Sequence, residues 1–395
     1  MWVSVSHRWE YRHTVLTLCV LAYFGIRFIE YALSLVFPDI QQSLGTSVFA
    51  IGVAVTASTL TYAISQLPSG ALGDRLGERA VIIAALGLTG LASLLFAAAP
   101  RGGFIVLGMS LIGLVSGAYY SPATALLTDL FEGTGRAIGI HRIGAQVVGF
   151  TGPIVAFVGA SYGWRTVPLL GALVTLPILV GVWLFVRPRT QTQPDVSLRE
   201  RVHPSALTRI LSRPTIKFST AIAGFGQFAD TATFSFLPFI LREYQGFSLQ
   251  LAGILFTLYF VALTVAQPAA GWLSDRFGRD SVAVVTLLIG VTGYIFLLSR
   301  DTFVIVVVAV VFIGLGMGWN PPVQSRVTDE LTEHERSIGF GLVRTVYIVF
   351  AGLCGVIIGG TVTVSGWANA IVILAIVMAI PAIALGVNTV FRVGL

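Results

Sequence analysis

Long apolar stretches alternate with short polar segments along the whole chain. Twelve of these stretches are long enough to cross a bilayer as helices, which takes about 20 mainly apolar residues. The first six cover roughly 14–37, 48–72, 80–99, 103–130, 138–161 and 165–187, and the second six cover roughly 217–241, 249–273, 281–299, 302–325, 337–362 and 366–391. The pattern therefore predicts an all-α membrane protein with twelve transmembrane helices.

One longer polar segment separates the two sets of six stretches. It is basic and contains four prolines, which argues against a further spanning helix. We therefore predict an N-terminal six-helix bundle at 1–187, a cytoplasmic linker at 188–216 and a C-terminal six-helix bundle at 217–395.

A charged turn with regularly placed glycines occurs once in each set. The first copy contains Asp74 and the second contains Asp275, 201 positions later. Other features recur in the same order. They are the Gly-x3-Gly pairs at 113–117 and 314–318, Arg136 and Arg336, the Gly-Trp pairs at 163–164 and 366–367, and Pro38 and Pro238, which we expect to end the first and seventh helices. Such repetition indicates gene duplication and predicts two pseudo-symmetric bundles.

Basic residues are distributed unevenly between alternate loops. If the N-terminus is cytoplasmic, only 4 of the 24 Lys and Arg residues lie in outer loops, and 2 lie within helices. The outer four are Arg101, Arg165, Arg242 and Arg300. The remaining 18 lie on the cytoplasmic side, as the positive-inside rule requires. We therefore expect a multi-pass protein of the cell (plasma) membrane with both termini in the cytoplasm.

The composition supports a bilayer environment and excludes several other classes of protein. The chain is 55% hydrophobic and 11% charged, whereas soluble domains average about 25% charged residues. The net charge of +6 lies mainly in loops, and no nucleic-acid partner is expected. The chain contains no Gly-x4-Gly-Lys-Ser/Thr loop for ATP. Cys19 and Cys354 are expected to be packing residues, and neither a metal site nor a cofactor is expected.

The repeated turn also resembles a known family. Between the second and third predicted helices the chain reads Gly70-x-Leu72-x-Asp74-Arg75-x-Gly77-x-Arg79. This segment resembles the signature loop of the major facilitator superfamily, and the resemblance extends over essentially the whole chain. It implies a secondary transporter that works by alternating access. In the second copy, Asp280 replaces the last basic residue of the motif.

The resemblance assigns the two turns to gating. The residues that it implies are Gly70, Asp74, Arg75, Gly77 and Arg79 in the first copy, Gly271, Asp275, Arg276 and Gly278 in the second copy, and Asp129 as a charge partner at the end of the fourth helix. Ion pairs between such groups can favour one state of a protein whose two halves rock. The alternative is that these charges only anchor the helix ends.

A second motif lies in the fifth predicted helix. Gly149, Gly152 and Pro153 resemble a helix-five motif that the family associates with export by antiport, although the glycine pair expected after the proline is absent. In the fourth helix, Met109 stands where such proteins often have an arginine. The resemblance therefore favours an exporter while leaving uptake open.

Four polar residues within predicted helices form another repeat. Arg27 and Glu30 in the first helix match Gln227 and Asp230 in the seventh, at an interval of 200. Residues three apart share one helix face, and a charge at membrane depth costs about 2.5–3.5 kcal/mol, which makes it a functional candidate. We predict that Glu30 and Asp230 load and release protons. The alternatives are a structural Arg27–Glu30 pair, and hydrogen bonds from Asp230 to neighbouring threonines or to a facing helix.

Further polar and aromatic residues are predicted to line a central cavity. They are Arg27, Tyr119, Tyr120, Gln227, Trp319, Asn320 and Arg344. The arginines would bind an anionic substrate or pair with the two carboxylates. The aromatic rings would stack on a planar substrate or simply pack. His141, near the start of the fifth helix, is expected to be solvated, and the alternative is a role in proton relay.

These patterns predict a proton-coupled secondary transporter and not an enzyme. The leading hypothesis is an exporter of small amphipathic or drug-like compounds that exchanges them for protons. One alternative is proton-linked uptake of an organic anion, and another is a membrane sensor built on a transporter scaffold. The expected partners are a small-molecule substrate, protons and the lipid bilayer, and we expect the protein to function as a monomer.

Overall fold

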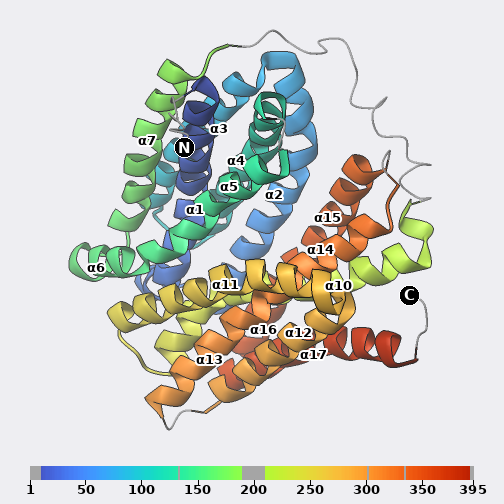
Figure 1. Ribbon diagram of the computed structural model, residues 1–395. Helices are drawn as coiled ribbons and strands as arrows, with labels where there is room; N and C mark the ends of the chain where they lie inside the picture. Colours follow the sequence, from blue (N-terminus) through green and yellow to red (C-terminus); the bar gives the residue numbers. More distant parts are fainter. Residues whose placement is uncertain (1–9, 132–133, 189–209, 300–301, 333–334, 392–395) are drawn as a thin grey trace, which may run out of the picture.

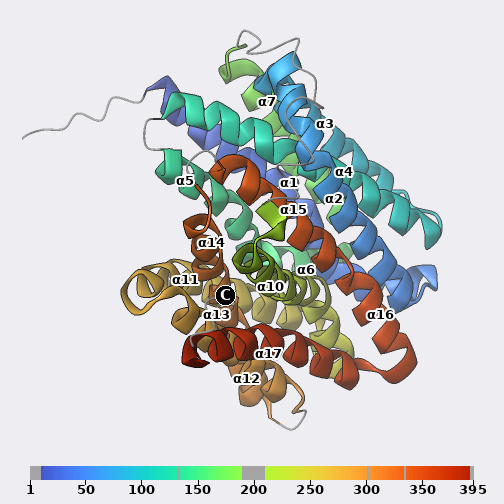
Figure 2. The ribbon, with the colours of Figure 1, turned by 90° about the vertical axis from the view of Figure 1, so that its right-hand side faces the viewer.

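The helices of the chain are arranged in two bundles, one from each half of the sequence. The computed structural model describes residues 10–131, 134–188, 210–299, 302–332 and 335–391. The helices of the first half form the upper part of Figure 1 and those of the second half form the lower part. Figure 2 shows that helices from both halves also lie side by side along the boundary between the bundles.

The first half provides six spanning segments. Its elements are α1 (Tyr11–Leu44), α2 (Val48–Leu76), α3 (Glu78–Ala97), α4 (Gly103–Leu130), α5 (Thr134–Val147), η1 (Val148–Thr151), α6 (Gly152–Tyr162) and α7 (Thr166–Phe185). The elements α5, η1 and α6 make one span. The 3-10 turn η1 interrupts this span just before Pro153, which lacks the N–H group that a continuous α-helix would need.

The second half repeats this arrangement. Its elements are α10 (Pro214–Phe239), η2 (Ile240–Tyr244), α11 (Leu249–Phe277), α12 (Arg279–Leu297), α13 (Phe303–Gly316), η3 (Met317–Trp319), α14 (Asn320–Asp329), α15 (Arg336–Gly352), α16 (Cys354–Ser365) and α17 (Trp367–Phe391). Two spans are again divided, because α13 continues into α14 and α15 continues into α16.

The helix α10 is the most polar of the spans. In the part of the chain that the structure describes, 11 helices are long and apolar enough to cross a membrane, and α10 completes the predicted twelve. It is less apolar because it carries Lys217, Gln227 and Asp230. The prediction of twelve helices in two pseudo-symmetric bundles is confirmed.

Pro38 and Pro238 do not end their helices, contrary to the prediction from the sequence. The helix α1 continues past Pro38 to Leu44, and α10 continues past Pro238 into the π-helical turn η2. A proline frees the carbonyl group four residues earlier. In a membrane helix, however, neighbouring groups and local π turns can satisfy that carbonyl, so the helix persists.

The turns of the two halves share unusual backbone geometry. Six glycines of the described residues have a positive φ, and they form three pairs with one member in each half. They are Gly45 and Gly246 (59° and 76°), Gly77 and Gly278 (85° and 93°), and Gly163 and Gly366 (83° and 84°). At Gly77 and Gly278 the chain turns directly from one helix into the next, in a conformation where a side chain would be strained. The duplicated sequence therefore specifies duplicated turns.

The helix ends lie on two opposite faces of the protein. We call one the terminal face, because it contains the start of α1 and the end of α7, where the Arg187 N–H donates to the Tyr11 hydroxyl (2.9 Å). We call the other the far face. It contains the α3–α4 and α6–α7 connections, where Arg165 donates to the Ala99 carbonyl (3.0 Å).

An ion pair joins the chain before α10 to the turn before α15. Most of the predicted linker, residues 189–209, lies outside the described residues, as do the chain ends and Arg300. Arg213, the residue directly before α10, donates to both carboxylate oxygens of Glu335 (3.0 and 2.6 Å). These hydrogen bonds lower the pKa of Glu335 from 4.5 to about 2. Because the folded state has the lower pKa, the pair contributes fully above pH 4.5 and is lost as the pH falls toward 2.

Replacing Glu335 by Gln should loosen this attachment. We expect faster amide hydrogen exchange at pH 7 in the first turn of α15 and in residues 210–216, because the charge-assisted bonds are lost. Mass spectrometry of the exchanged protein measures this. The control Glu10→Gln removes the exposed Arg12–Glu10 pair instead and should leave α15 unchanged. Equal exchange in Glu335→Gln and wild type would show that the pair does not hold this segment.

Candidate functional site

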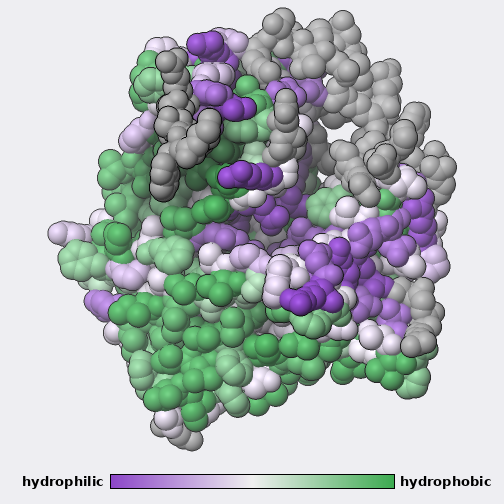
Figure 3. Space-filling view, viewed as in Figure 1, coloured by the Kyte–Doolittle hydropathy of each residue, from purple (hydrophilic) through white to green (hydrophobic). Residues whose placement is uncertain are grey.

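A cavity of about 240 Å³ lies between the two halves. Its walls come from α1, α2, α4 and α5 of the first half and from α10, α11, α14 and α15 of the second half. The charged and amide side chains that line it are Arg27, Glu30, Arg142, Gln146, Gln227, Asp230, Gln267, Asn320, Gln324 and Arg344. In Figure 3 hydrophilic side chains gather along the boundary between the halves.

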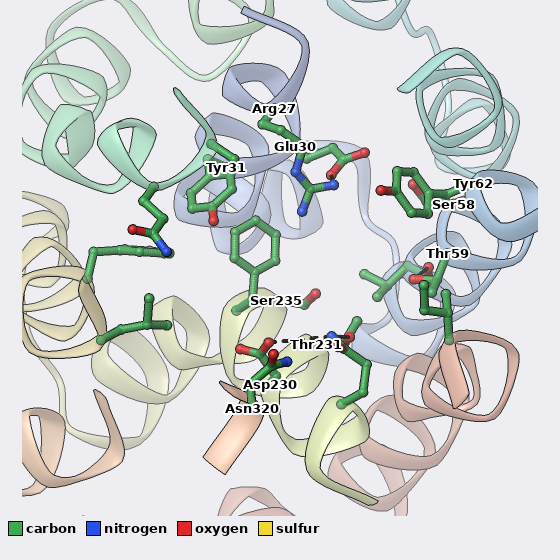
Figure 4. Close-up of a pocket in the computed structure, with 18 of the residues that line it drawn as sticks. Arg27, Glu30, Tyr31, Ser58, Thr59, Tyr62, Asp230, Thr231, Ser235 and Asn320 are labelled. Carbon is green, nitrogen blue, oxygen red and sulfur yellow. Dashed lines mark hydrogen bonds and ion pairs between the residues drawn. The ribbon is translucent and has the colours of Figure 1, made fainter. Parts of the chain in front are cut away.

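Arg27 and Glu30 form an ion pair on one face of α1. The Glu30 residue is only 8% exposed, and the Arg27 guanidinium also lies near the rings of Tyr31 (5.9 Å) and Tyr62 (5.7 Å). Figure 4 shows both side chains on the α1 side of the cavity, with Asp230 across from them. The structural pair that the sequence left open is therefore present, and Arg27 contributes little uncompensated charge.

Asp230 lies on α10, on the other side of the cavity. Its carboxylate accepts long hydrogen bonds from the Gln227 amide (3.4 Å) and from the Tyr259 hydroxyl on the facing helix α11 (3.4 Å). None of the ion pairs among the described residues involves Asp230. A carboxylate at membrane depth with only these weak partners is a candidate for reversible protonation.

Two further arginines line the cavity without a carboxylate partner among the residues described. Arg344 of α15 lies over the ring of Tyr120 of α4 at 4.8 Å, a contact between the halves. Arg142 of α5 is exposed within the cavity wall. The pairing of Arg344 with Glu30 or Asp230 that the sequence allowed does not occur in this structure, since Glu30 pairs with Arg27. These two guanidinium groups give the cavity an excess of positive charge.

Gln227 and Asn320 line the cavity, as predicted. The three aromatic residues that were also predicted to line it are not among the described residues of its wall. Tyr119 is fully buried and donates to the Cys19 carbonyl (2.6 Å). Trp319 is 1% exposed and packs against α10. Tyr120 lies beneath Arg344. Adjacent residues of a helix point to different sides, so depth along the sequence alone could not assign them.

His141 is buried, contrary to the expectation that it is solvated. Its exposed fraction is 0%. The Nε2 atom lies 3.0 Å from the Tyr119 hydroxyl, and the ring stacks on Tyr23 with centroids 4.9 Å apart. The position near the start of α5 suggested water, but α1 and α4 cover this side of the helix.

The two repeated charged turns lie at the terminal face. In the second copy Arg279 pairs with Asp275 and Asp329. In the first copy Arg79 donates to the Trp183 carbonyl (2.6 Å). These contacts join helices of the same half and do not reach the cavity, so the gating role of the turns stays a prediction.

At the far face the two halves touch backbone to backbone. A methyl group on Gly52 of α2 would overlap the carbonyl oxygen of Gly355 of α16. A methyl group on Gly152 of α6 would lie 2.6 Å from the carbonyl oxygen of Gly253 of α11. Only small residues permit such an approach between membrane helices. Gly152 of the helix-five motif therefore serves the contact between the halves.

Each of these glycine contacts is accompanied by a threonine. The glycines of α2 and α11 stand 201 positions apart, and each precedes a threonine by four residues. Thr56 accepts from the Val356 N–H (3.1 Å), and Thr257 donates to the Gly149 carbonyl (2.9 Å). These threonines were not predicted from the sequence, although the interval of 201 residues between them is visible there.

An ion pair and an aromatic cluster complete the contact at the far face. Arg242 of η2 pairs with Asp39 of α1. Nearer the middle of the protein, the ring of Tyr31 contacts Phe234 (4.2 Å) and Phe260 (4.9 Å) of the other half. Together with the glycine contacts, these groups close the far side of the cavity.

Comparison with known proteins identifies the class to which this fold and cavity belong. The sequence profile of the Major Facilitator Superfamily matches residues 19–251 and again residues 218–392. The chain therefore belongs to this superfamily and is a multi-pass membrane protein.

Three of the relatives are named for an aromatic acid or for drug resistance. The chain is 24% identical to a gallate transporter of Pseudomonas putida over 325 residues, which is 73% of this chain and 71% of the relative. It is 27% identical to a 4-hydroxybenzoate transporter of Pseudomonas aeruginosa over 323 residues, 72% of this chain and 71% of the relative. It is 27% identical to a multidrug resistance protein of Enterobacter lignolyticus over 278 residues, 66% of this chain and 65% of the relative.

Solved structures resemble the chain over almost its whole length. A bacterial homologue of the human lysosomal transporter Spinster, in an inward-facing and occupied conformation, superposes with a TM-score of 0.80 at 16% identity and covers 97% of each chain. A D-xylose–proton symporter superposes with a TM-score of 0.79 at 14% identity, over 95% of this chain and 97% of that chain. At these identities the similarity concerns the fold alone.

Replacing Gly52 by Ala should open the far face. The added methyl overlaps the backbone of Gly355, and such overpacking costs about 1–3 kcal/mol. The ratio of molecules closed at the far face to molecules open there should therefore fall about 5- to 150-fold. Electron–electron distances between spin labels at Ser43 and Ala368, both exposed at this face, measure the change.

A control substitution tests whether the effect comes from this contact. Gly360→Ala places a methyl no closer than 3.7 Å to its neighbours, so the distance distribution should match wild type. A Gly52→Ala protein that keeps the wild-type distribution would show that the glycine contact does not set the conformation.

Proposed function

We propose that the protein is a proton-coupled secondary transporter of a small organic anion. The observation that carries this proposal is the charge of the cavity, where three guanidinium groups face two carboxylates. One carboxylate, Glu30, is already paired with Arg27. The remaining positive charge is costly at membrane depth unless an anion enters, and guanidinium groups bind carboxylates bidentately.

The excess positive charge of the cavity favours anion transport over the export of amphipathic compounds, which was the leading hypothesis from the sequence. The sequence could not tell whether Arg344 was neutralised by a carboxylate. In the structure its guanidinium lies over an aromatic ring instead. Two of the relatives are named as transporters of aromatic acids, which supports the same substrate class.

Asp230 is proposed to couple transport to protons. Arg27 and Glu30 on α1 face Asp230 on α10 across the cavity (Figure 4). When Asp230 is ionised, its charge competes with Glu30 for Arg27 and so attracts the two halves toward each other. When Asp230 is protonated, Arg27 remains with Glu30, and this attraction disappears. Protonation thereby changes the relative stability of the two conformations.

Alternating access is proposed to follow from two opposite closures. The contacts of the far face hold the present conformation closed on that side. In the other conformation, Asp74, Arg75, Arg79 and Asp129 and their counterparts in the second half would close the terminal face. We propose that this face is cytoplasmic, that residues 1–187 and 217–395 are the moving bodies, and that residues 188–216 link them.

Export of amphipathic compounds is the second candidate function. The rings of Tyr31, Phe234 and Phe260 form an apolar surface in the cavity. Gly149 and Gly152 lie where the halves meet, and one relative is named as a multidrug resistance protein. An aromatic surface would also accommodate the ring of an aromatic acid, so this observation discriminates less than the charge balance does.

A liposome assay decides between these functions. Purified protein is reconstituted with an imposed pH gradient, and uptake of 4-hydroxybenzoate is compared with movement of the cationic dye ethidium. We expect proton-driven accumulation of the carboxylate and no movement of the dye. Outward movement of the dye against a proton gradient, without carboxylate flux, would support the exporter instead. Binding of the carboxylate without any flux would support a sensor.

Replacing Asp230 by Asn should separate transport from its driving force. A gradient of one pH unit can sustain about tenfold accumulation for one proton per anion. We expect wild type to approach this ratio and Asp230→Asn to reach a ratio of about 1 while still exchanging internal for external substrate. Glu330→Gln, which changes an exposed carboxylate at the terminal face, is the control. Unchanged accumulation in both Asp230→Asn and Glu30→Gln would exclude these residues as coupling groups.

A further inference from the structure

Arg142 and Arg344 lie at similar depths in the two halves, one on α5 and the other on α15. The helix α5 begins at Thr134 and α15 begins at Arg336, and each arginine lies eight positions after the first residue of its helix. With a rise of 1.5 Å per residue, each Cα lies about 12 Å from the terminal-face end of its helix. Each half therefore contributes one guanidinium group at about the same depth.

Arg344 lies over an aromatic ring of the first half, and Arg142 lines the same cavity. The Arg344 guanidinium lies 4.8 Å from the ring centroid of Tyr120. Both arginines line the cavity. The two cationic groups thus face one cavity, although they come from different halves.

The carboxylates of the cavity do not neutralise this pair. Glu30 is engaged by Arg27. Asp230 lies 16 positions after Pro214, the first residue of α10, which places it about 24 Å from the terminal-face end of its helix, or roughly 12 Å deeper than the arginines. No ion pair in the described ranges of the chain involves Arg142 or Arg344.

We propose that Arg142 and Arg344 form a clamp for the anionic group of the substrate, and that binding of this group draws the terminal face closed. This inference rests on the proposed transport of an organic anion. In the empty cavity the two like charges repel across the boundary and keep the halves apart. A carboxylate between them accepts N–H···O bonds from both guanidinium groups.

The clamp links substrate binding to conformational change. A ligand shifts a conformational equilibrium only if it binds one state more tightly than the other. An anion that touches a single half has no such preference, whereas one that bridges Arg142 and Arg344 binds best when the two halves approach. Phosphate and sulfonate groups also present pairs of oxygens that accept parallel N–H···O bonds, so the chemistry of the clamp is that of a small oxyanion.

Binding measurements test the first part of the proposal. The full-length protein in lipid nanodiscs is titrated with 4-hydroxybenzoate, and inorganic phosphate and methanesulfonate are titrated as separate probes. Loss of the bonds from either arginine, in Arg142→Gln or Arg344→Gln, should weaken 4-hydroxybenzoate binding about 10- to 100-fold. The double variant should lose less than the product of the single losses, because both groups hold one carboxylate.

Two further variants serve as controls. Arg344→Lys keeps the charge but not the planar pair of donors, so we expect an affinity between those of wild type and Arg344→Gln. Arg12→Gln removes an exposed arginine at the start of α1 that pairs with Glu10. It should bind 4-hydroxybenzoate as wild type does, which separates the clamp from the general positive charge of the terminal face.

Distance measurements test closure. Spin labels at Thr128 of α4 and Thr328 of α14 report on the terminal face across the two halves, and the native Cys19 and Cys354 are both buried. Saturating 4-hydroxybenzoate should shorten the distance in wild type. It should not shorten it in Arg142→Gln or Arg344→Gln, even at concentrations that fill their sites.

The outcomes distinguish failure of the clamp from failure of the proposed function. If wild type neither binds nor transports any of the three anions, the proposed function fails and the clamp with it. If 4-hydroxybenzoate is transported and both single variants bind it like wild type, the clamp is overturned while the proposed function stands. If the variants bind weakly but the wild-type distance does not change with ligand, closure by the clamp is overturned.

Discussion

The close approach of the two halves at the far face determines the shape of the whole protein. Gly52 lies against Gly355, and Gly152 lies against Gly253, because none of them has a side chain to keep the backbones apart. Lipid provides little hydrophobic force to press helices together, so packing and hydrogen bonds such as those of Thr56 and Thr257 must hold them. With the halves joined on one side, the space between them remains as a cavity on the other.

The chemistry of the cavity depends on this arrangement. Residues that are far apart in the chain become neighbours only because the halves meet, as Arg344 and Tyr120 do. The charges are also divided between the halves: Arg27, Glu30 and Arg142 belong to the first, and Asp230 and Arg344 to the second. Any change in these charges, by a proton or by an anion, therefore acts on the contact between the halves.

The internal repeat of the sequence predicted the architecture of the protein better than it predicted the residues of the cavity. It located both charged turns, the Gly-x3-Gly pairs and the polar residues of α1 and α10, because duplication preserves intervals. It did not predict that α1 and α10 continue past their prolines, since that depends on how neighbouring groups satisfy the freed carbonyls. The sequence also led us to place Tyr119 and Trp319 in the cavity and His141 in water, whereas all three are buried.

The sequence by itself determined the twelve helices, the two halves and the membrane as solvent. Hydrophobic length and internal repetition are local properties, and they survive without knowledge of packing. Only the tertiary structure decided which side of each helix faces the cavity, that Glu30 takes Arg27, and that Arg142 and Arg344 have no carboxylate partner among the described residues. Two charged side chains pair only if their helices lie close enough, and the distance between helices depends on the side chains that pack between them.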